Sequence, residues 1–118
     1  MKIGASVLSV DPSDLENEIK QLETSGIDFI SFDIMDGQFV PSITYGSDVI
    51  DDLRDKTNLP LEAHLMVENP ETIVKNFVSS CDIISVHVEA CKDPEFIIKT
   101  VKEAGKKISF ALKPETSI

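Results

Sequence analysis

Residues 29–41 read Phe-Ile-Ser-Phe-Asp-Ile-Met-Asp-Gly-Gln-Phe-Val-Pro, and this stretch decides the fold. Residues 29–35 are mostly apolar and β-prone, and Asp36-Gly37 follows them, which predicts a buried parallel strand that ends in a turn. Asp33 interrupts the apolar run, although a carboxylate in such a strand is costly to bury without a partner, a metal ion or a proton. The strand therefore predicts a functional group near its carboxyl end.

Strands and helices alternate along the whole chain. The sequence predicts strands over residues 2–9, 29–35, 61–66, 83–87 and 107–112. It predicts helices over residues 12–25, 47–56, 70–80 and 94–104, three of them after an Asp-Pro or Asn-Pro start. This alternation indicates a parallel sheet with right-handed crossovers, in either an open doubly wound sheet or a (β/α) barrel. No G-x-G-x-x-G motif follows the first strand, which disfavours a dinucleotide-binding fold.

Polar residues recur near the ends of four successive predicted strands. Ser6, Asp33, His64 and His87 are 27, 31 and 23 residues apart, about one βα unit each. In a barrel such positions lie at the carboxyl-terminal rim, where barrel active sites are found. Asp33 could ligate a metal ion, act as a base, or be satisfied by backbone N–H groups or a lysine, and the sequence does not choose among these.

His64 lies near the end of an apolar strand, where a lone histidine is more often a hydrogen-bonded core residue than a ligand. Its pairing with Asp33 one unit earlier favours a shared metal site, because imidazole plus carboxylate suits zinc, iron, manganese or cobalt. Met35 and Met66 would lie at the same rim, where they either fill core gaps or line a small polar pocket. Asp36-Gly37 is most simply a turn, in which Asp36 could also brace the following loop.

Three further side chains have simple interpretations. Glu89 has no evident partner and is expected at the rim. Cys81 and Cys91 lack C-x-x-C or zinc-ligand spacing, so we expect reduced thiols near the ends of strand 83–87.

Composition restricts the class of protein. A chain of 118 residues with 42% hydrophobic residues suits one domain with a real core. No apolar run approaches the ~18 residues of a membrane-spanning helix, and residues 1–6 lack a signal-peptide core, so we expect a cytoplasmic protein with no membrane partner. The formal net charge of -10 argues against nucleic acid as a partner, although a local site can still accept an anionic small molecule.

Five segments resemble the ribulose-phosphate 3-epimerase family in order and spacing. They are Lys-Ile-Gly-Ala-Ser-Val-Leu-Ser at 2–9, Asp-Ile-Met-Asp-Gly-Gln-Phe-Val-Pro at 33–41, His-Leu-Met at 64–66, Val-His-Val-Glu-Ala at 86–90 and Ala-Leu-Lys-Pro-Glu-Thr-Ser at 111–117. The resemblance implies a TIM (β/α)8 barrel, of which residues 1–118 form one partial domain with about the first five strands and four helices.

The resemblance also implies a metal-dependent isomerase that interconverts D-ribulose 5-phosphate and D-xylulose 5-phosphate. In this mechanism the C3 proton is removed and returned through an enediolate that a divalent metal ion stabilises. Asp33 resembles the first acid/base and a metal ligand, and His64 resembles a second ligand. We expect a small ketose phosphate as substrate and a homo-oligomer. The expected substrate contacts are Ser6, His64, Met35 and Met66, whereas His87 matches a family histidine without an assigned role.

Two departures from the family pattern matter. Ser31 stands where the family has a histidine ligand, and a serine hydroxyl is a far weaker ligand than imidazole. The second departure is length, because a TIM barrel typically has about 250 residues. We therefore expect these 118 residues to be the first part of a longer protein and to be inactive alone, with the second catalytic aspartate and the phosphate site outside them.

Two other functions stay open. A non-catalytic relative could keep the fold and bind a sugar phosphate or a protein, which the serine at position 31 favours. A half-barrel module could instead close by pairing with another half. The intact residues that favour the epimerase are Ser6, Asp33, His64, Met35 and Met66.

Overall fold

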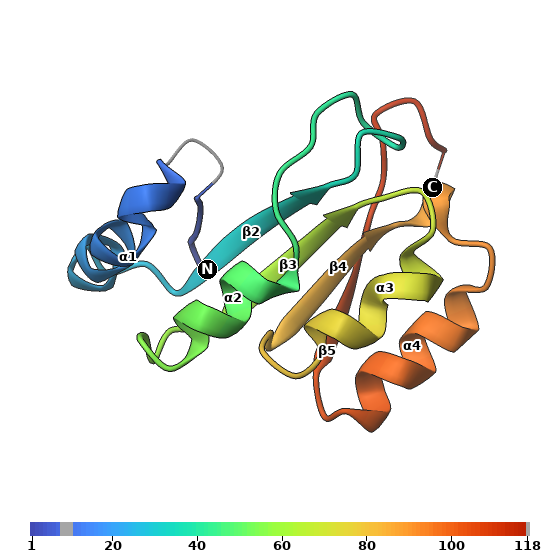
Figure 1. The fold of residues 1–118 in the computed structure, drawn as a ribbon. Helices are drawn as coiled ribbons and strands as arrows, with labels where there is room; N and C mark the ends of the chain where they lie inside the picture. The colour runs from blue at the N-terminus through green and yellow to red at the C-terminus, as the bar shows by residue number, and fades with distance from the viewer. Residues whose placement is uncertain (8–10, 118) are drawn as a thin grey trace.

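The computed structural model describes residues 1–7 and 11–117, whose framework is one parallel sheet of five strands (Figure 1). The strands are β1 (Gly4–Ser6), β2 (Phe29–Met35), β3 (Leu61–Met66), β4 (Ile83–His87) and β5 (Lys107–Ala111). The helices are α1 (Leu15–Thr24), α2 (Ser47–Arg54), α3 (Pro70–Phe77) and α4 (Pro94–Glu103), with 3-10 turns η1 (Pro12–Asp14) and η2 (Val88–Ala90). Within the described residues, no helix has the length and apolar character needed to cross a membrane.

The spatial order of the strands, β1-β2-β3-β4-β5, is the same as their order in the chain. Each crossover therefore moves one strand further in the same direction, and right-handed crossovers then place successive helices on the same face. Figure 1 shows α2, α3 and α4 over one face of the sheet. A doubly wound sheet reverses direction and has helices on both faces, so the open-sheet alternative is wrong. The five parallel strands and four helices fit the predicted amino-terminal part of a TIM barrel.

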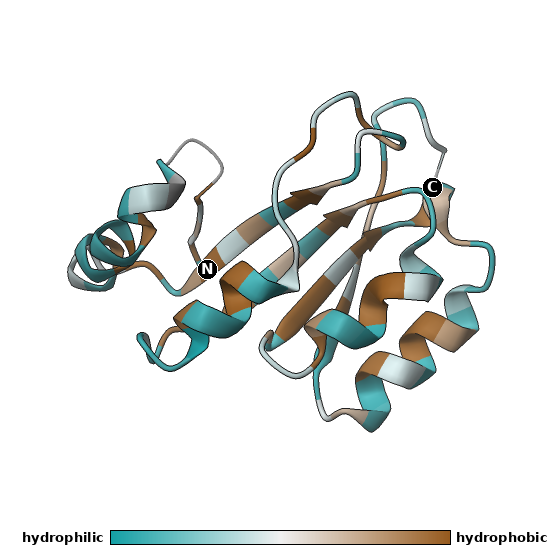
Figure 2. Ribbon diagram, viewed as in Figure 1, coloured by the Kyte–Doolittle hydropathy of each residue, from teal (hydrophilic) through white to brown (hydrophobic). Residues whose placement is uncertain are grey.

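Side-chain alternation along the strands produces the core, and Figure 2 shows apolar and polar residues alternating along the strand ribbons. On β2, Ile30 and Phe32 are fully buried beside Leu61 and Ala63 of β3. Burial of one large apolar side chain contributes about 1.5–3 kcal/mol, so this layer holds the helices on the sheet. The helices contribute to the same cluster through Ile19 (α1), Ile50 (α2), Val74 (α3) and Ile97 (α4).

The sheet is open, and β1 and β5 are its two edge strands. This agrees with the prediction that the chain contains only the first five strands of a barrel. A barrel sheet of only five strands is also predicted to have an uncovered apolar face. This face is only partly present, because the sheet face opposite the helices carries polar groups such as Asp33 and His64. Apolar exposure is found instead at the β5 edge, where Phe110 is 39% and Leu112 is 41% exposed. Phe110 pairs in register with the buried Val86 and therefore lies on the helix side of the sheet.

The bounds of β2, β3 and β4 are as predicted, whereas the other elements are shorter. β1 covers Gly4–Ser6 rather than 2–9, and residues 8 and 9 lie outside the described part of the chain. α2 ends two residues early because the Lys56 N–H bonds the Leu53 carbonyl (3.0 Å) in a tighter turn. α3 ends three residues early at a similar turn. The sequence also did not predict η2.

The Asp-Pro and Asn-Pro starts predict N-caps at Asp11, Asn69 and Asp93, and this prediction is only partly correct. Asp11 accepts a hydrogen bond from the Ser13 N–H (2.9 Å), but this bond begins η1, and α1 follows later. Asn69 has the N-cap position of α3 without a capping hydrogen bond, because its Oδ1 accepts from Lys92 Nζ (3.2 Å) instead. Asp93 caps α4 through its side chain, as predicted.

Both cysteines are free thiols, as predicted. Cys81 is fully buried, and Cys91 is half-buried after β4, where its thiol donates to the His87 carbonyl (3.3 Å). Burial raises the pKa of Cys81 to about 12 and the pKa of Cys91 to about 11, so neither forms a reactive thiolate at neutral pH.

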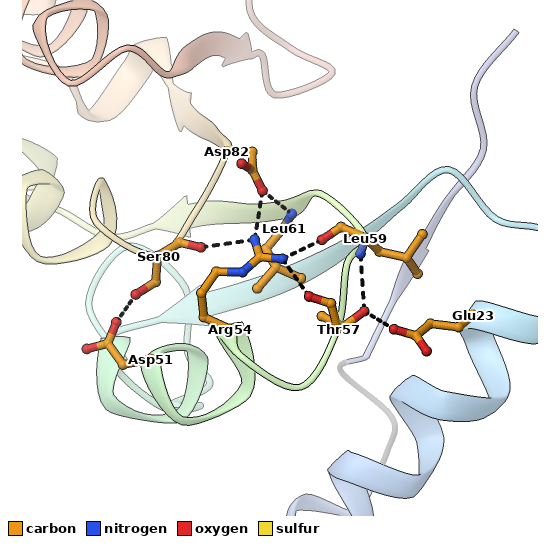
Figure 3. A network of polar contacts seen from close by, with 8 residues as sticks. All are labelled: Glu23, Asp51, Arg54, Thr57, Leu59, Leu61, Ser80 and Asp82. Carbon is orange, nitrogen blue, oxygen red and sulfur yellow. Dashed lines mark hydrogen bonds and ion pairs between the residues drawn. The ribbon is translucent and has the colours of Figure 1, made fainter.

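Arg54 is the last residue of α2, and its side chain joins this helix to the segments that precede β3 and β4 (Figure 3). Its guanidinium donates to the carbonyls of Thr57 (3.0 Å) and Leu59 (2.8 Å). It also donates to Asp82 Oδ2 (2.8 Å), which in turn accepts from the Leu61 N–H (2.9 Å). Because the guanidinium is planar and always charged, it satisfies these acceptors together and fixes where both strands begin.

Two hydroxyl groups extend this network to neighbouring helices. Ser80 donates to Asp51 of α2, and Thr57 donates to Glu23 of α1 (Figure 3). Thr57 and Ser80 are both buried, and buried hydroxyl groups need such partners. The amino-terminal ends of the strands are thus tied to the first two helices.

We expect Arg54→Ala to lower the free energy of unfolding by about 2–3 kcal/mol, because it leaves the carbonyls of Thr57 and Leu59 without this donor and removes the positive charge beside Asp82. Urea unfolding followed by circular dichroism measures this loss. The matched control is Lys20→Ala, which removes an exposed ion pair to Glu16 and should change stability by less than about 0.5 kcal/mol. Equal losses in both variants would contradict the role of Arg54.

Candidate active site

Ser6, Asp33 and His64 come together at the carboxyl-terminal ends of β1, β2 and β3. Asp33 and His64 are register partners, and Ser6 ends β1 on the same face. Ser6 Oγ donates to Asp33 Oδ2 (2.7 Å), and His64 Nδ1 lies 3.2 Å from Asp33 Oδ1. The Asp33 side chain is 13% exposed. Among the described residues it has no contact with a backbone N–H or a lysine that would support the structural alternative.

Thr44 braces the end of β2, and no sequence pattern pointed to it. Its hydroxyl donates to the Asp33 carbonyl (2.7 Å) and accepts from the Met35 N–H (3.0 Å). Its own N–H donates to the Met35 carbonyl (3.2 Å). The loop over residues 36–45 therefore folds back along β2 and fixes the backbone of this strand at Asp33 and Met35.

Asp36 forms the predicted turn and braces two loops. Its Oδ1 accepts from the N–H groups of Gln38 (2.8 Å) and Phe39 (2.9 Å), and its Oδ2 accepts from the Glu68 N–H (2.8 Å) after β3. Gly37 has φ +73, a conformation that favours glycine. Burial opposes the charge of Asp36, but the three N–H donors outweigh burial and lower its pKa.

His87 extends the cluster to β4. Its Nε2 lies 3.0 Å from His64 Nε2, and the two rings stack with centroids 5.1 Å apart. Phe39, from the loop after β2, contacts the same ring at 5.1 Å between centroids. Burial and the neighbouring His64 lower the pKa of His87, which favours the neutral form of its ring.

Glu89 joins two loops at the rim, through partners that the sequence did not identify. Its Oε1 accepts from Thr116 Oγ1 (2.5 Å) and from the Lys113 N–H (2.6 Å). Its Oε2 lies 3.6 Å from His87 Nδ1. The hydrogen bonds from Thr116 and Lys113 lower the pKa of Glu89 to about 2. The sequence could not show this link, because it joins residues 24 and 27 positions apart in two loops.

Met35 and Met66 are register partners at the last positions of β2 and β3. They lie on the sheet face that carries the cluster, and both are half-buried. The structure therefore places both thioethers at the same rim.

Ser31 lies on the same face, two residues before Asp33. Its register partners are Ser6 on β1 and Glu62 on β3. The Glu62 carboxylate is engaged elsewhere, because its Oε1 accepts from Ser85 Oγ (2.6 Å). The position where an imidazole was expected thus holds a small hydroxyl group.

The described residues contain no group of three or more His, Cys, Asp or Glu side chains arranged to hold a metal ion. They do contain two pairs of neighbouring carboxylate and imidazole groups, Asp33 with His64 at 3.2 Å and Glu89 with His87 at 3.6 Å. A hollow of about 320 Å³ lies at the opposite ends of the strands, where Asp28, Asp82 and Lys107 line it. That end of a barrel serves stability rather than catalysis, so the hollow is not the candidate site.

Comparison with known proteins identifies the family. The sequence model of the ribulose-phosphate 3 epimerase family matches residues 2–118. The chain belongs to this family. Ribulose-phosphate 3-epimerases from Bacillus subtilis and Methanocaldococcus jannaschii are 43% and 45% identical to it over its whole length. The match covers 55% and 50% of those relatives, so the chain spans about half the length of the curated epimerases that it matches.

A solved structure supports the fold alone. Yersinia pestis DHPS, determined with a pterine-sulfa conjugate, aligns with a TM-score of 0.68 over 99% of this chain and 46% of its own. The sequence identity of that pair is only 6%, which carries no information about function. The epimerase family assignment therefore rests on the sequence, and the arrangement of strands agrees with it.

The low pKa of Glu89 predicts how the rim responds to acid. The carboxyl pKa falls from its ordinary 4.5 to about 2 on folding, so the stability it contributes is present above pH 4.5 and is lost as the pH falls through about 2. We expect the Lys113 amide resonance to titrate with a midpoint near 2 and to lose this titration in Glu89→Gln. The charge-matched control is Glu95→Gln on α4, which should leave the Lys113 titration unchanged. A Lys113 midpoint near 4.5 in the unaltered chain would disprove the link.

Proposed function

We propose that this chain forms the amino-terminal half of a TIM barrel whose whole protein interconverts D-ribulose 5-phosphate and D-xylulose 5-phosphate. The observation that carries the proposal is the convergence of Ser6 and His64 on the Asp33 carboxylate, in a chain of the epimerase family. These groups lie at the carboxyl-terminal ends of the strands, where barrel enzymes hold their reacting groups.

Asp33 would act as the base that removes the C3 proton of the ketose phosphate. The electrons of the C3–H bond then move toward the C2 carbonyl and give an enediolate, and a proton returned to the opposite face inverts C3. Ser6 donates a hydrogen bond to Asp33 Oδ2 and so orients the carboxylate, which leaves Oδ1 on the side of His64. The second acid would come from residues beyond this chain.

Asp33 and His64 would also hold a divalent metal ion, and their chemistry fits that role. A carboxylate and an imidazole with donor atoms 3.2 Å apart can share one ion of zinc, iron, manganese or cobalt. When bound, the metal would stabilise the negative charge that develops on the substrate oxygens. Met35 and Met66, at the same rim, would surround the reacting carbons with apolar surface and exclude water.

Two features of the sheet support the half-barrel part of the proposal. Both edge strands, β1 and β5, could pair with further parallel strands to reach the eight of a TIM barrel. Phe110 and Leu112 would be covered by the helix that follows β5 in such a barrel. A homo-oligomer remains part of this proposal.

A second function is favoured by one observation. Ser31 replaces an imidazole in the expected ligand set, which suits a non-catalytic relative that keeps the fold and binds a sugar phosphate. The intact contacts among Ser6, Asp33 and His64 favour the epimerase, because loss of catalysis usually changes several site residues together.

The decisive variant for catalysis is Asp33→Asn. In a protein form that epimerises ribulose 5-phosphate, we expect it to reduce kcat about a hundred- to ten-thousand-fold, because an amide cannot accept the C3 proton. Exchange of the C3 proton in deuterated water, followed by NMR, measures the step directly. Asp52→Asn, an exposed change on α2, is the control and should retain full activity. The 118-residue chain alone should show no turnover, and formation of D-xylulose 5-phosphate by that chain would refute the placement of the second acid outside it.

The substitution at position 31 can be reversed. We expect Ser31→His to tighten binding of Co²⁺, because it adds an imidazole two residues from Asp33 on the same face. Absorption titration with Co²⁺ and metal content after dialysis measure the change. Ser109→His is the matched control, since it adds an imidazole on the same face but three strands from Asp33. If both variants bind alike, Ser31 does not face the metal site.

A further inference from the structure

His87 has no part in the proposed reaction, yet it is the side chain in contact with the far edge of His64. The two Nε2 atoms are 3.0 Å apart, which is hydrogen-bond distance, and one of the two must carry the proton. The other nitrogen of His64, Nδ1, faces Asp33 Oδ1 at 3.2 Å. Both ring nitrogens of His64 are thus engaged, one by the catalytic carboxylate and one by His87.

We propose that His87 is a positioning residue that holds the Nε2 edge of His64 and thereby keeps its Nδ1 edge turned toward Asp33. This inference rests on the proposed function, because it assigns to Nδ1 the role of metal ligand. A ligating histidine almost always bonds a second group through its other ring nitrogen, which fixes its orientation and tautomer. Here that second group is another imidazole rather than the usual carboxylate or carbonyl.

His87 is itself held from several directions, as a positioning residue must be. Its side chain is only 12% exposed, and Phe39 contacts the ring at 5.1 Å between centroids. The Cys91 thiol donates to its backbone carbonyl (3.3 Å). Its Nδ1 lies 3.6 Å from Glu89 Oε2, which is longer than a hydrogen bond. The His87 ring is therefore held by Phe39 of the loop after β2, and its backbone by Cys91 after β4.

Two amide substitutions separate this role from ordinary packing. His87→Gln places an amide group near the position of the imidazole Nε2, so it can still bond His64. His87→Asn is shorter by one methylene and places its amide near the position of Nδ1, where it cannot reach His64. Because both variants carry the same neutral amide, a general folding defect would affect them alike.

The first readout needs no metal ion. In the metal-free chain, nuclear Overhauser contacts of the His64 Hδ2 and Hε1 protons with Ser6 and Met35 report which edge of the ring faces Asp33. We expect a single orientation in the unaltered chain and in His87→Gln, and averaging of two orientations in His87→Asn. A single orientation in His87→Asn, identical to that of the unaltered chain, would overturn the proposal.

The second readout is the dissociation constant for Co²⁺ from an absorption titration. We expect His87→Asn to weaken Co²⁺ binding about 10- to 100-fold relative to His87→Gln. Equal Co²⁺ affinities in the two variants would also overturn the proposal. If the unaltered chain binds no Co²⁺, the metal site of the proposed function fails, whereas the orientation of His64 still decides whether His87 positions it.

Discussion

The two-residue alternation of side chains along β2 and β3 is the constraint on which both the core and the site depend. Ile30 and Phe32 are buried against the helices, and that burial forces Ser31 and Asp33 to the opposite face. A slip of one residue would expose Phe32 and bury the Asp33 carboxylate, so it is opposed by both apolar and electrostatic free energy. The contact between Asp33 and His64 is therefore fixed by the packing of residues that take no part in it.

Beyond the strands, the site is held by side chains that bond the backbone of a neighbouring loop. Asp36 reaches the loop after β3, and Glu89 reaches the segment after β5. Three backbone N–H groups lower the pKa of Asp36 against the opposing effect of burial, and the Thr116 hydroxyl together with the Lys113 N–H lowers the pKa of Glu89, so both carboxylates are charged and keep these links at neutral pH. In the proposed reaction, such cross-links between loops would hold the site groups in place before a substrate arrives, as catalysis by positioning requires.

The sequence predicted those parts of the molecule that depend on local pattern. The bounds of β2, β3 and β4 followed from their apolar runs, and the spacing of Asp33 and His64 placed them at one rim. The observed β1 begins at Gly4 and covers Gly4–Ser6, whereas the apolar pattern predicted a strand over residues 2–9, of which residues 8 and 9 lie outside the described part of the chain. Thr44 and the partners of Glu89 were missed, because their hydrogen bonds join residues from 9 to 27 positions apart and leave no periodic signal. Whether His87 acts on His64 or merely packs beside it also depends on ring geometry, which a sequence does not contain.

The position of Ser31 bears on how far the site has diverged. Ser31 lies on the same sheet face as Asp33, two residues earlier on β2, and its register partners are Ser6 and Glu62. The contact between Asp33 and His64 does not depend on Ser31. It is held by strand register, by the Ser6 hydroxyl and, in our proposal, by His87. Replacing an imidazole at position 31 can therefore weaken metal binding without altering the arrangement of the remaining groups.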